Sequence, residues 1–358
     1  MFTPPRIPDE VLNMIFEHRA LENSKDLLCV CSLVCKAWLP VARYHLFRKV
    51  VLHLDSDGNT TFLGLLQHPL CSFTDSVRKV RLLPAQSTRM SQRVNTDLAV
   101  LNRLTRVNAL CLHDQKIIPL DTLQVISTVF KDITSLTMML RFKRSADGIQ
   151  FMSSFSQLEE VHFELVRTPV GDPPPNNLSI PPKLRSLRLN SIRGHECWFS
   201  DHRLPSMTTL SLYHIRPLND IPRLTQMLQT FGRNLRHLTL RFDAQKGDLP
   251  LEVNFSYNTE LRYLEIDLSA LTKKHISPVL ATLNACDLEM LVWRNRKSFD
   301  DFSKKSWEDL DALVSDRERF RALVAFEIRA SNDSTKYNPR ARMPLSEARG
   351  VLSGSTEI

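Results

Sequence analysis

Apolar residues recur along most of the chain in one short pattern, in which two residues separate the first pair of apolar positions and one separates the second. Clear copies are LRSLRL at 184–189, LRHLTL at 235–240 and LRYLEI at 261–266. Alternation of this kind is typical of a strand with one buried face. The pattern begins at residues 47, 77, 107, 133, 158, 184, 207, 235, 261, 288 and 323. The sequence therefore predicts a series of short strands at nearly regular intervals.

The segments between these strands have helical periodicity or loop composition. Helical spacing is present at 121–132, 224–232, 275–286 and 306–320, and Gly232 suits a helix C-terminus. One strand with its return segment cannot bury its apolar face alone, but a stack of such units can. The intervals are close to those of a leucine-rich repeat, although the usual Asn or Cys after each strand is mostly absent. We expect an irregular α/β solenoid; a non-repetitive α/β domain is the alternative, which the near-constant spacing disfavours.

The first fifty residues have a different, purely helical pattern. Apolar spacing predicts one helix opening at Pro8, a second running from about Leu27 to Trp38, and a third opening at Pro40 and ending near Phe47. Three short helices bury little surface, and this segment holds more apolar residues than one small core can take. Such a surplus predicts an interaction surface. Phe47 also begins the first strand pattern, so the helices should lead directly into the solenoid.

Composition excludes several classes of protein. The 358 residues are 42% hydrophobic and 24% charged, and the formal net charge is +8. The basic excess is diffuse, with short clusters such as Arg78, Lys79 and Arg81, so nucleic-acid binding is not favoured. No apolar run approaches the roughly 18 residues of a membrane span, and no secretory signal opens the chain. We therefore expect a cytoplasmic or nuclear protein without a membrane partner.

Candidate chemistry is sparse. The seven cysteines are scattered, and we expect most to be reduced core residues without a bound metal. The chain has no Gly-rich phosphate loop, no G-x-S-x-G and no H-E-x-x-H, so we expect neither an enzyme nor a cofactor. The richest local cluster, GHECWFSDH at 194–202, is expected to be a return loop.

Residues 5–47 resemble an F-box. The family pattern opens with Leu-Pro-x-Glu-Leu/Val-Leu and Ile-Phe, continues through Asp-Leu-Leu and Val-Cys-Lys/Arg-x-Trp, and closes with Leu and an aromatic residue. This chain has IPDEVL and Ile15-Phe16, then Asp26-Leu27-Leu28, VCKAW at 34–38 and Leu46-Phe47. Ile7 stands where the family usually has Leu. A generic helical bundle is the alternative, and the joint order and spacing of these motifs argue against it.

The resemblance implies a function as well as a fold. F-box proteins bind a Skp-type adaptor of cullin–RING ubiquitin ligases, and their second domain captures a protein substrate without doing chemistry. Two other functions remain as alternatives to a ligase subunit: an F-box scaffold acting outside the ligase, and a basic solenoid that binds nucleic acid. By resemblance, the adaptor-facing residues are Pro8, Leu12, Ile15, Phe16, Leu28, Val34, Cys35, Trp38 and Leu46.

The face of the sheet away from the return segments is the candidate substrate surface. Alternation along the strands places a mixture of Tyr, Arg and acidic residues there, a composition common at protein interfaces. The residues selected are Arg188, Tyr213, His237, Arg241, Tyr263, Glu265 and Arg294, with Lys79, Arg81, Glu160, His162, Glu164 and Asp267 on the same face. The expected organisation is a helical F-box at 1–49, a solenoid at 50–330 and a disordered tail at 331–358.

Overall fold

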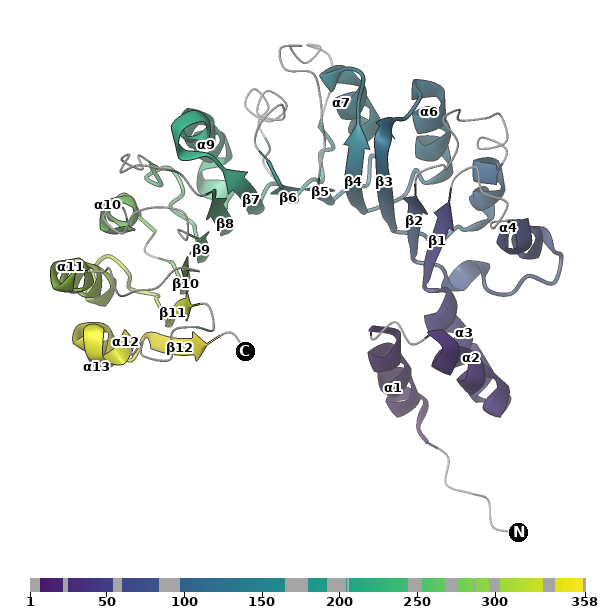
Figure 1. Ribbon diagram of the computed structural model, residues 1–358, viewed down its shortest axis with the longest axis horizontal. Coiled ribbons are helices and arrows are strands. Elements are labelled where there is room, and N and C mark those ends of the chain that lie inside the picture. Colours follow the sequence, from purple (N-terminus) through teal and green to yellow (C-terminus); the bar gives the residue numbers. More distant parts are fainter. Residues whose placement is uncertain are drawn as a thin grey trace, which may run out of the picture. The chain divides into compact units, whose positions relative to one another are not determined.

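The structure is a computed structural model of an α/β protein with N-terminal helices followed by parallel β-strands (Figure 1). The chain divides into two units. The first comprises Met1–Lys143 with Gln150–Leu158, and the second comprises Arg144–Ile149 with Glu159–Ile358. The residues described are 7–21, 25–53, 60–83, 97–164, 180–191, 204, 206–243, 253–267, 276–285, 287–295, 303–330 and 339–356.

The first unit opens with three helices, as the sequence predicts. They are α1 (Asp9–Leu21), α2 (Lys25–Val34) and α3 (Trp38–Phe47). The second boundary differs from the prediction, because α2 ends at Val34 and Trp38 begins α3. Residues Lys36 and Ala37 form a turn, and Pro40 lies within the first turn of α3, where its missing N–H leaves no intrahelical bond unmade.

The same unit continues directly into a parallel sheet. After Arg48 the strand β1 (Lys49–His53) begins, followed in order by β2 (Lys79–Leu83), β3 (Ala109–Ile117) and β4 (Ser135–Arg141). Across these strands Val50 pairs with Val80, Val80 pairs with Leu110, and Leu110 pairs with Leu136. The return segments contain α4 (Thr60–Gln67), η2 (Thr74–Ser76), η3 (Leu101–Arg103) and α6 (Leu120–Val129). The helix α7 (Ser145–Ser153) spans the boundary between the units.

The second unit repeats the same design. Its strands pair in parallel in sequence order: β5 (Glu160–Phe163), β6 (Ser186–Leu189), β7 (Thr209–Ile215), β8 (His237–Phe242), β9 (Tyr263–Asp267), β10 (Met290–Asn295), β11 (Ala325–Ala330) and β12 (Leu352–Thr356). Its helices are α9 (Pro217–Phe231), α10 (Ile276–Ala281), α11 (Lys304–Ser315), α12 (Pro339–Arg342) and α13 (Pro344–Arg349), with η4 (Gly232–Asn234) after α9. In Figure 1, α9, α10 and α11 lie on one side of these strands.

The hydrophobic pattern predicts the core of both units correctly. Every predicted strand is present, and the last two apolar residues of each copy are buried, such as Leu187 with Leu189 and Leu238 with Leu240. The period of two directs these side chains toward the helices, and it directs their neighbours to the opposite face. We call that opposite face the open face of each unit. The fold is therefore a solenoid-like α/β repeat, as predicted.

The predicted return helices are also present, with different bounds. The helix expected at 224–232 begins earlier, at Pro217, and contains Pro222 in its second turn. Gly232 ends it with φ of +50°, a conformation that favours glycine and agrees with the prediction. The cluster at 194–202, expected to be a return loop, lies outside the described residues.

The prediction of a disordered tail is wrong for residues 339–356. Asp311 on α11 accepts hydrogen bonds from the backbone N–H of Leu345 (2.9 Å) and Ser346 (2.8 Å), which satisfies the first turn of α13. Met343 is buried, Gly350 ends α13 in the left-handed conformation, and β12 pairs with β11. One polar cap and one strand thus order a segment whose composition alone suggests disorder.

Candidate functional site

The three N-terminal helices enclose a small core of their own. Leu12, Phe16, Leu28 and Ala42 are fully buried, and Trp38 packs against them with its ring edge-on to that of Phe16 at 5.6 Å between centroids. Cys31, Val41 and Leu46 complete the cluster. Since an edge-to-face aromatic pair adds about 1 kcal/mol to simple burial, Phe16 and Trp38 fix how α1 packs against α3.

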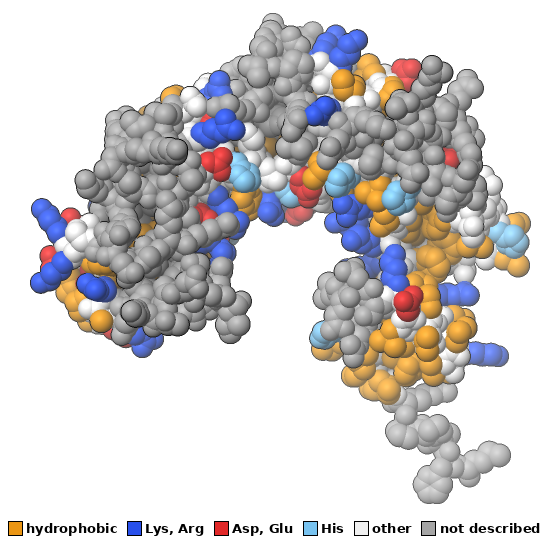
Figure 2. Space-filling view, viewed as in Figure 1, with side chains coloured by type: hydrophobic (Ala, Val, Ile, Leu, Met, Phe, Trp, Pro, Cys, Tyr) orange, Lys and Arg blue, Asp and Glu red, His pale blue; other side chains and the backbone are white. Residues whose placement is uncertain are grey.

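A second set of apolar side chains on α1 and α2 is exposed. It alternates with the core residues at helical spacing, so each helix has one face in the core and another in solvent. Figure 2 shows apolar side chains gathered over these helices. We call this set the helical apolar face: Ile7, Val11, Met14 and Ile15 from the first helix and its approach, with Leu27, Val30, Leu33 and Val34 from the second.

The structure divides the nine residues predicted to face an adaptor into three groups. Leu12, Phe16 and Leu28 lie in the module's core, Trp38 and Leu46 are half-buried against it, and the remaining four are exposed. Direct contact with a partner is open to the exposed group: Pro8, Ile15, Val34 and Cys35. The core residues can act only by holding the helices in place.

Sequence reasoning missed the most exposed members of the helical apolar face. Leu33 is 84% exposed and Met14 is 71% exposed, yet neither belongs to the family motif. The signal was available, because Leu27, Val30 and Val34 repeat at i, i+3 and i+7 beside the core stripe. The cysteines were also misplaced, since Cys29 and Cys35 are exposed rather than buried.

Polar contacts join the helices to the start of the sheet. The guanidinium of Arg48 donates to Glu17 at 2.9 Å, and Nε2 of His45 lies 3.2 Å from Oδ1 of Asn13. Since Oδ1 can only accept, Nε2 of His45 carries a proton in this contact. Burial and the nearby charge of Arg48 lower the pKa of His45, with an opposing effect from Glu17.

In the second unit, the residues predicted as a substrate surface form one connected network. The guanidinium of Arg188 lies 4.6 Å from the ring centroid of Tyr213, and that of Arg241 lies 4.7 Å from it. The two arginines come from β6 and β8, which flank the strand that carries Tyr213. Both cations are therefore attracted to one aromatic ring, which fixes their positions.

Glu265 is the centre of this network. Its carboxylate accepts hydrogen bonds from Nε of Arg294 (2.6 Å) and from the hydroxyl of Tyr263 (2.8 Å), and an Arg241 amino group lies at 3.4 Å. The ring of Tyr263 lies 6.1 Å from that of His237, which connects the last of the seven selected residues. The prediction of exposed acidic positions needs correction here, because Glu265 and Asp267 are buried on this face.

The electrostatics of the network follow from these contacts. Burial alone would raise the pKa of Glu265, but hydrogen bonds from Tyr263 and Arg294, together with the charges of Arg294 and Arg241, lower it below its usual value. Burial and the bond to Glu265 raise the pKa of Tyr263 to about 12. Glu265 is therefore ionised and Tyr263 protonated at neutral pH.

The side chains of this network bind one another in the free protein. Arg188 adds a guanidinium with no carboxylate of the described residues within ion-pair distance. No group of three or more His, Cys, Asp or Glu side chains able to hold a metal ion is present among the residues that the structure describes. Over the same residues, no helix is both long enough and apolar enough to span a bilayer.

Comparison with known proteins gives one family match. No curated protein is significantly similar to the chain. The F-box-like family model matches residues 5–53, which cover the three helices and the first strand. This range contains the small aromatic core, the helical apolar face and every motif that suggested the resemblance. The chain therefore has an F-box-like domain at its N-terminus, formed by residues 5–53.

Proposed function

We propose that the chain is the substrate-recognition subunit of an SCF-type (Skp–cullin–F-box) ubiquitin ligase. In this proposal the F-box-like domain binds a Skp-type adaptor, and the solenoid-like repeat captures a protein target. F-box domains bind such adaptors in general, and F-box proteins are generally non-catalytic. The chain would then accelerate ubiquitin transfer by holding a target lysine close to the charged conjugating enzyme.

The observation that carries this proposal is the helical apolar face. The core of the helices is already complete, so eight further apolar side chains remain in solvent. Exposed apolar residues that are contiguous, rather than scattered, mark an interaction site. Their burial in a partner would recover the hydrophobic stabilisation that the isolated domain cannot obtain.

The open face of the second unit supports the other half of the proposal. Tyr and Arg dominate binding energy at protein interfaces, and here Tyr213 holds Arg188 and Arg241 in place before any partner arrives. Fewer rotamers then have to be ordered on binding, which lowers the entropic cost. We propose that a protein target is bound at this Arg188–Tyr213–Arg241 group. Glu265, which also binds Arg294, would hold Arg241 in position.

The test is co-purification of the full chain with a Skp-type adaptor, in the wild type and in two matched variants. Leu33 on α2 is 84% exposed, and Leu70, which follows α4, is 83% exposed. Leu33→Glu should abolish a one-to-one complex, because it places a charge in the apolar interface. Leu70→Glu makes the same chemical change on equal exposed area outside the helices, and it should bind as the wild type does.

A folded wild-type chain that does not bind the adaptor would contradict the proposal, as would equal loss in both variants. Where the complex forms, reconstitution with the cullin, the RING subunit and a conjugating enzyme tests the ligase itself. Ubiquitin transfer to a captured protein, reduced by Arg188→Ala with Tyr213→Ala, supports a substrate receptor. Binding without any transfer supports a scaffold outside the ligase.

A further inference from the structure

A pocket of about 390 Å³ lies within the first unit, where the helices meet the first strands. Leu28 and Leu46 lie beside basic residues in its lining, and most of the lined surface is apolar. Its volume is in the range of small-molecule sites in proteins. The residues that line it are Glu17, Lys25, Leu28, His45, Leu46, Arg48, Lys49, Arg78, Lys79, Asn108 and Ala109.

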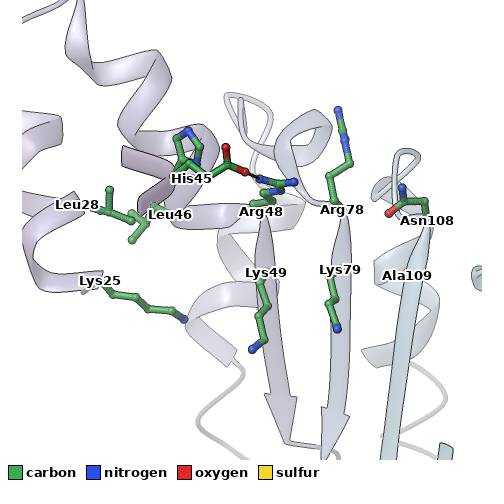
Figure 3. A pocket seen from close by; sticks show the side chains of 11 residues that line it. Lys25, Leu28, His45, Leu46, Arg48, Lys49, Arg78, Lys79, Asn108 and Ala109 are labelled. Atoms are coloured by element: carbon green, nitrogen blue, oxygen red, sulfur yellow. Dashed lines mark hydrogen bonds and ion pairs between the residues drawn. The ribbon is translucent and has the colours of Figure 1, made fainter. Parts of the chain in front are cut away.

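Three lysines from neighbouring elements line this pocket. Figure 3 shows Lys49 and Lys79 pointing the same way from neighbouring strands, with Lys25 extending toward them from α2. Among the residues that line the pocket, Glu17 is the single carboxylate, and it binds Arg48 at 2.9 Å. No carboxylate of the described residues lies within ion-pair distance of Lys25, Lys49 or Lys79. The pocket thus has three ammonium groups without a counter-charge from the described residues.

The register of the sheet makes this arrangement unfavourable for the protein alone. Lys49 and Lys79 are direct Cα partners of β1 and β2, and strands lie only about 4.8 Å apart. Like charges in directly opposite positions of a sheet destabilise it. Arg81 extends the positive charge along β2, where its amino group lies 3.0 Å from Nδ1 of His113. The sheet therefore holds two exposed lysines side by side on neighbouring strands.

We propose that this pocket is a binding site for a compact polyanion with at least two closely spaced phosphate groups. Lysine ammonium groups bind phosphate as point charges. Three of them match the charge of two adjacent phosphates better than they match the single charge of a carboxylate. Asn108 offers a neutral donor at the same pocket. The phosphates come either from a free small molecule or from a doubly phosphorylated protein segment. This site is independent of the proposed adaptor and target surfaces.

The experiment is isothermal titration of the full chain at constant ionic strength with two probes. Pyrophosphate represents the free small molecule, and a peptide with two adjacent phosphoserines represents the protein segment. The pocket variant is Lys25→Gln, Lys49→Gln, Lys79→Gln. Its matched control is Lys36→Gln, Lys131→Gln, Lys143→Gln, which removes the same charge from exposed positions of the same unit outside the pocket.

We expect saturable binding of at least one probe, weakened at least tenfold in the pocket variant and less than twofold in the control. Saturable binding of pyrophosphate alone assigns the site to a small molecule, and tighter binding of the peptide assigns it to a protein segment. No saturable binding of either probe would overturn the proposal. Equal weakening in both variants would also overturn it, because net charge rather than the pocket would then explain the binding.

Thermal unfolding supplies a second, opposite readout. Without any probe, the pocket variant should unfold at an equal or higher temperature than the wild type, because the Lys49–Lys79 repulsion is removed. With the bound probe present, only the wild type and the control should gain stability. A pocket variant that unfolds several degrees lower without probe would assign the lysines a structural role and overturn the proposal. Adaptor binding, measured on the same variants, should be unchanged.

Discussion

Nε of Arg294 donates a hydrogen bond of 2.6 Å to Oε1 of Glu265 across adjacent strands of the second unit. Arg241 approaches the same oxygen at 3.4 Å from the strand on the other side. One buried carboxylate thus joins three consecutive repeats on the open face. Each repeat of a solenoid contacts only its nearest neighbours. A polar link across three repeats therefore makes this part of the surface more rigid than apolar stacking alone would.

Replacement of the central carboxylate should destabilise the second unit. Glu265→Gln removes the buried charge that accepts hydrogen bonds from Arg294 and Tyr263, and we expect a loss of roughly 2 to 3 kcal/mol in the free energy of unfolding at pH 7. Urea unfolding of the wild type and the variant at neutral pH measures this loss in the free energy of unfolding. The control is Glu289→Gln, whose exposed carboxylate lies 3.3 Å from Arg262. Removal of such a surface pair should cost less than about 1 kcal/mol.

The same variant has a predicted pH dependence. The folded state lowers the pKa of Glu265, so its contribution to stability is present above the unfolded value of 4.5 and is lost as the pH falls through the folded value. The difference between wild type and Glu265→Gln should therefore shrink below pH 4.5. A difference that stays constant from pH 7 to pH 3.5 would show that packing, not charge, explains the destabilisation.

Core and surface positions of the F-box-like domain should respond differently to mutation. Leu12→Ala creates a cavity in the small core and should cost about 2 to 5 kcal/mol, enough to unfold a domain of this size. Leu33→Ala removes an exposed side chain and should change stability by less than about 0.5 kcal/mol. We expect it to weaken adaptor binding roughly tenfold, as an interface hot spot does.

Circular dichroism and adaptor affinity, measured on both variants, separate the two effects. Leu12→Ala should lose helix signal and binding together, whereas Leu33→Ala should lose binding alone. Normal folding and normal binding of Leu12→Ala would contradict the assignment of Leu12 to the core. For the same reason, substitutions at Phe16 or Leu28 cannot identify the binding surface.

The repeat could be predicted from the sequence because each strand is a local pattern with a period of two. Leu210 and Leu212, for example, are apolar because of the face they occupy, and no distant contact is needed to place them. The seven residues selected on the open face were found by the same rule. Their contacts were not predictable, because the distance from Arg188 to Tyr213 depends on register and rotamers rather than on spacing.

The errors come from contacts between segments far apart in the sequence. The tail from Pro339 is ordered because Asp311, on an earlier helix, caps α13 and because β11 offers an unpaired edge. Its sequence does carry the capping signals, with Pro344 at the first turn and Gly350 at the end. The F-box motif likewise names residues without distinguishing core from surface, since Leu12 and Ile15 match it equally well.

Acid should destabilise the F-box-like domain through His45. Burial lowers the pKa of its imidazole in the folded state, so the unfolded chain takes up the proton first. Stability should therefore fall as the pH drops below 6.5, the unfolded value, until the folded pKa is passed. In a chain whose other three tryptophans are replaced by Phe, the fluorescence of Trp38, which packs beside Phe16, reports unfolding of this domain against temperature at pH 7.5 and pH 5.5.

The matched variants are His45→Gln and His68→Gln. The first removes the buried titrating group and should reduce the drop in midpoint between the two pH values. The second removes an exposed histidine outside the helices and should leave the drop unchanged. An equal drop in all three proteins would contradict the role of His45.

The contact between Asp311 and the last helix should determine whether residues 339–356 stay folded. Asp311→Ala leaves the N–H groups of Leu345 and Ser346 without their acceptor, and hydrogen bonds to a charged group contribute about 1.5 to 3 kcal/mol each. We expect α13 and β12 to detach and to expose the edge of β11, which promotes association between chains. Hydrogen exchange should become fast at Leu345, Ser346 and β12, and should stay slow in β8.

Asp309→Ala on the exposed side of α11 is the control and should leave all of these amides protected. Unchanged protection at Ser346 in the Asp311→Ala chain would show that Met343 and the strand pairing alone hold the segment.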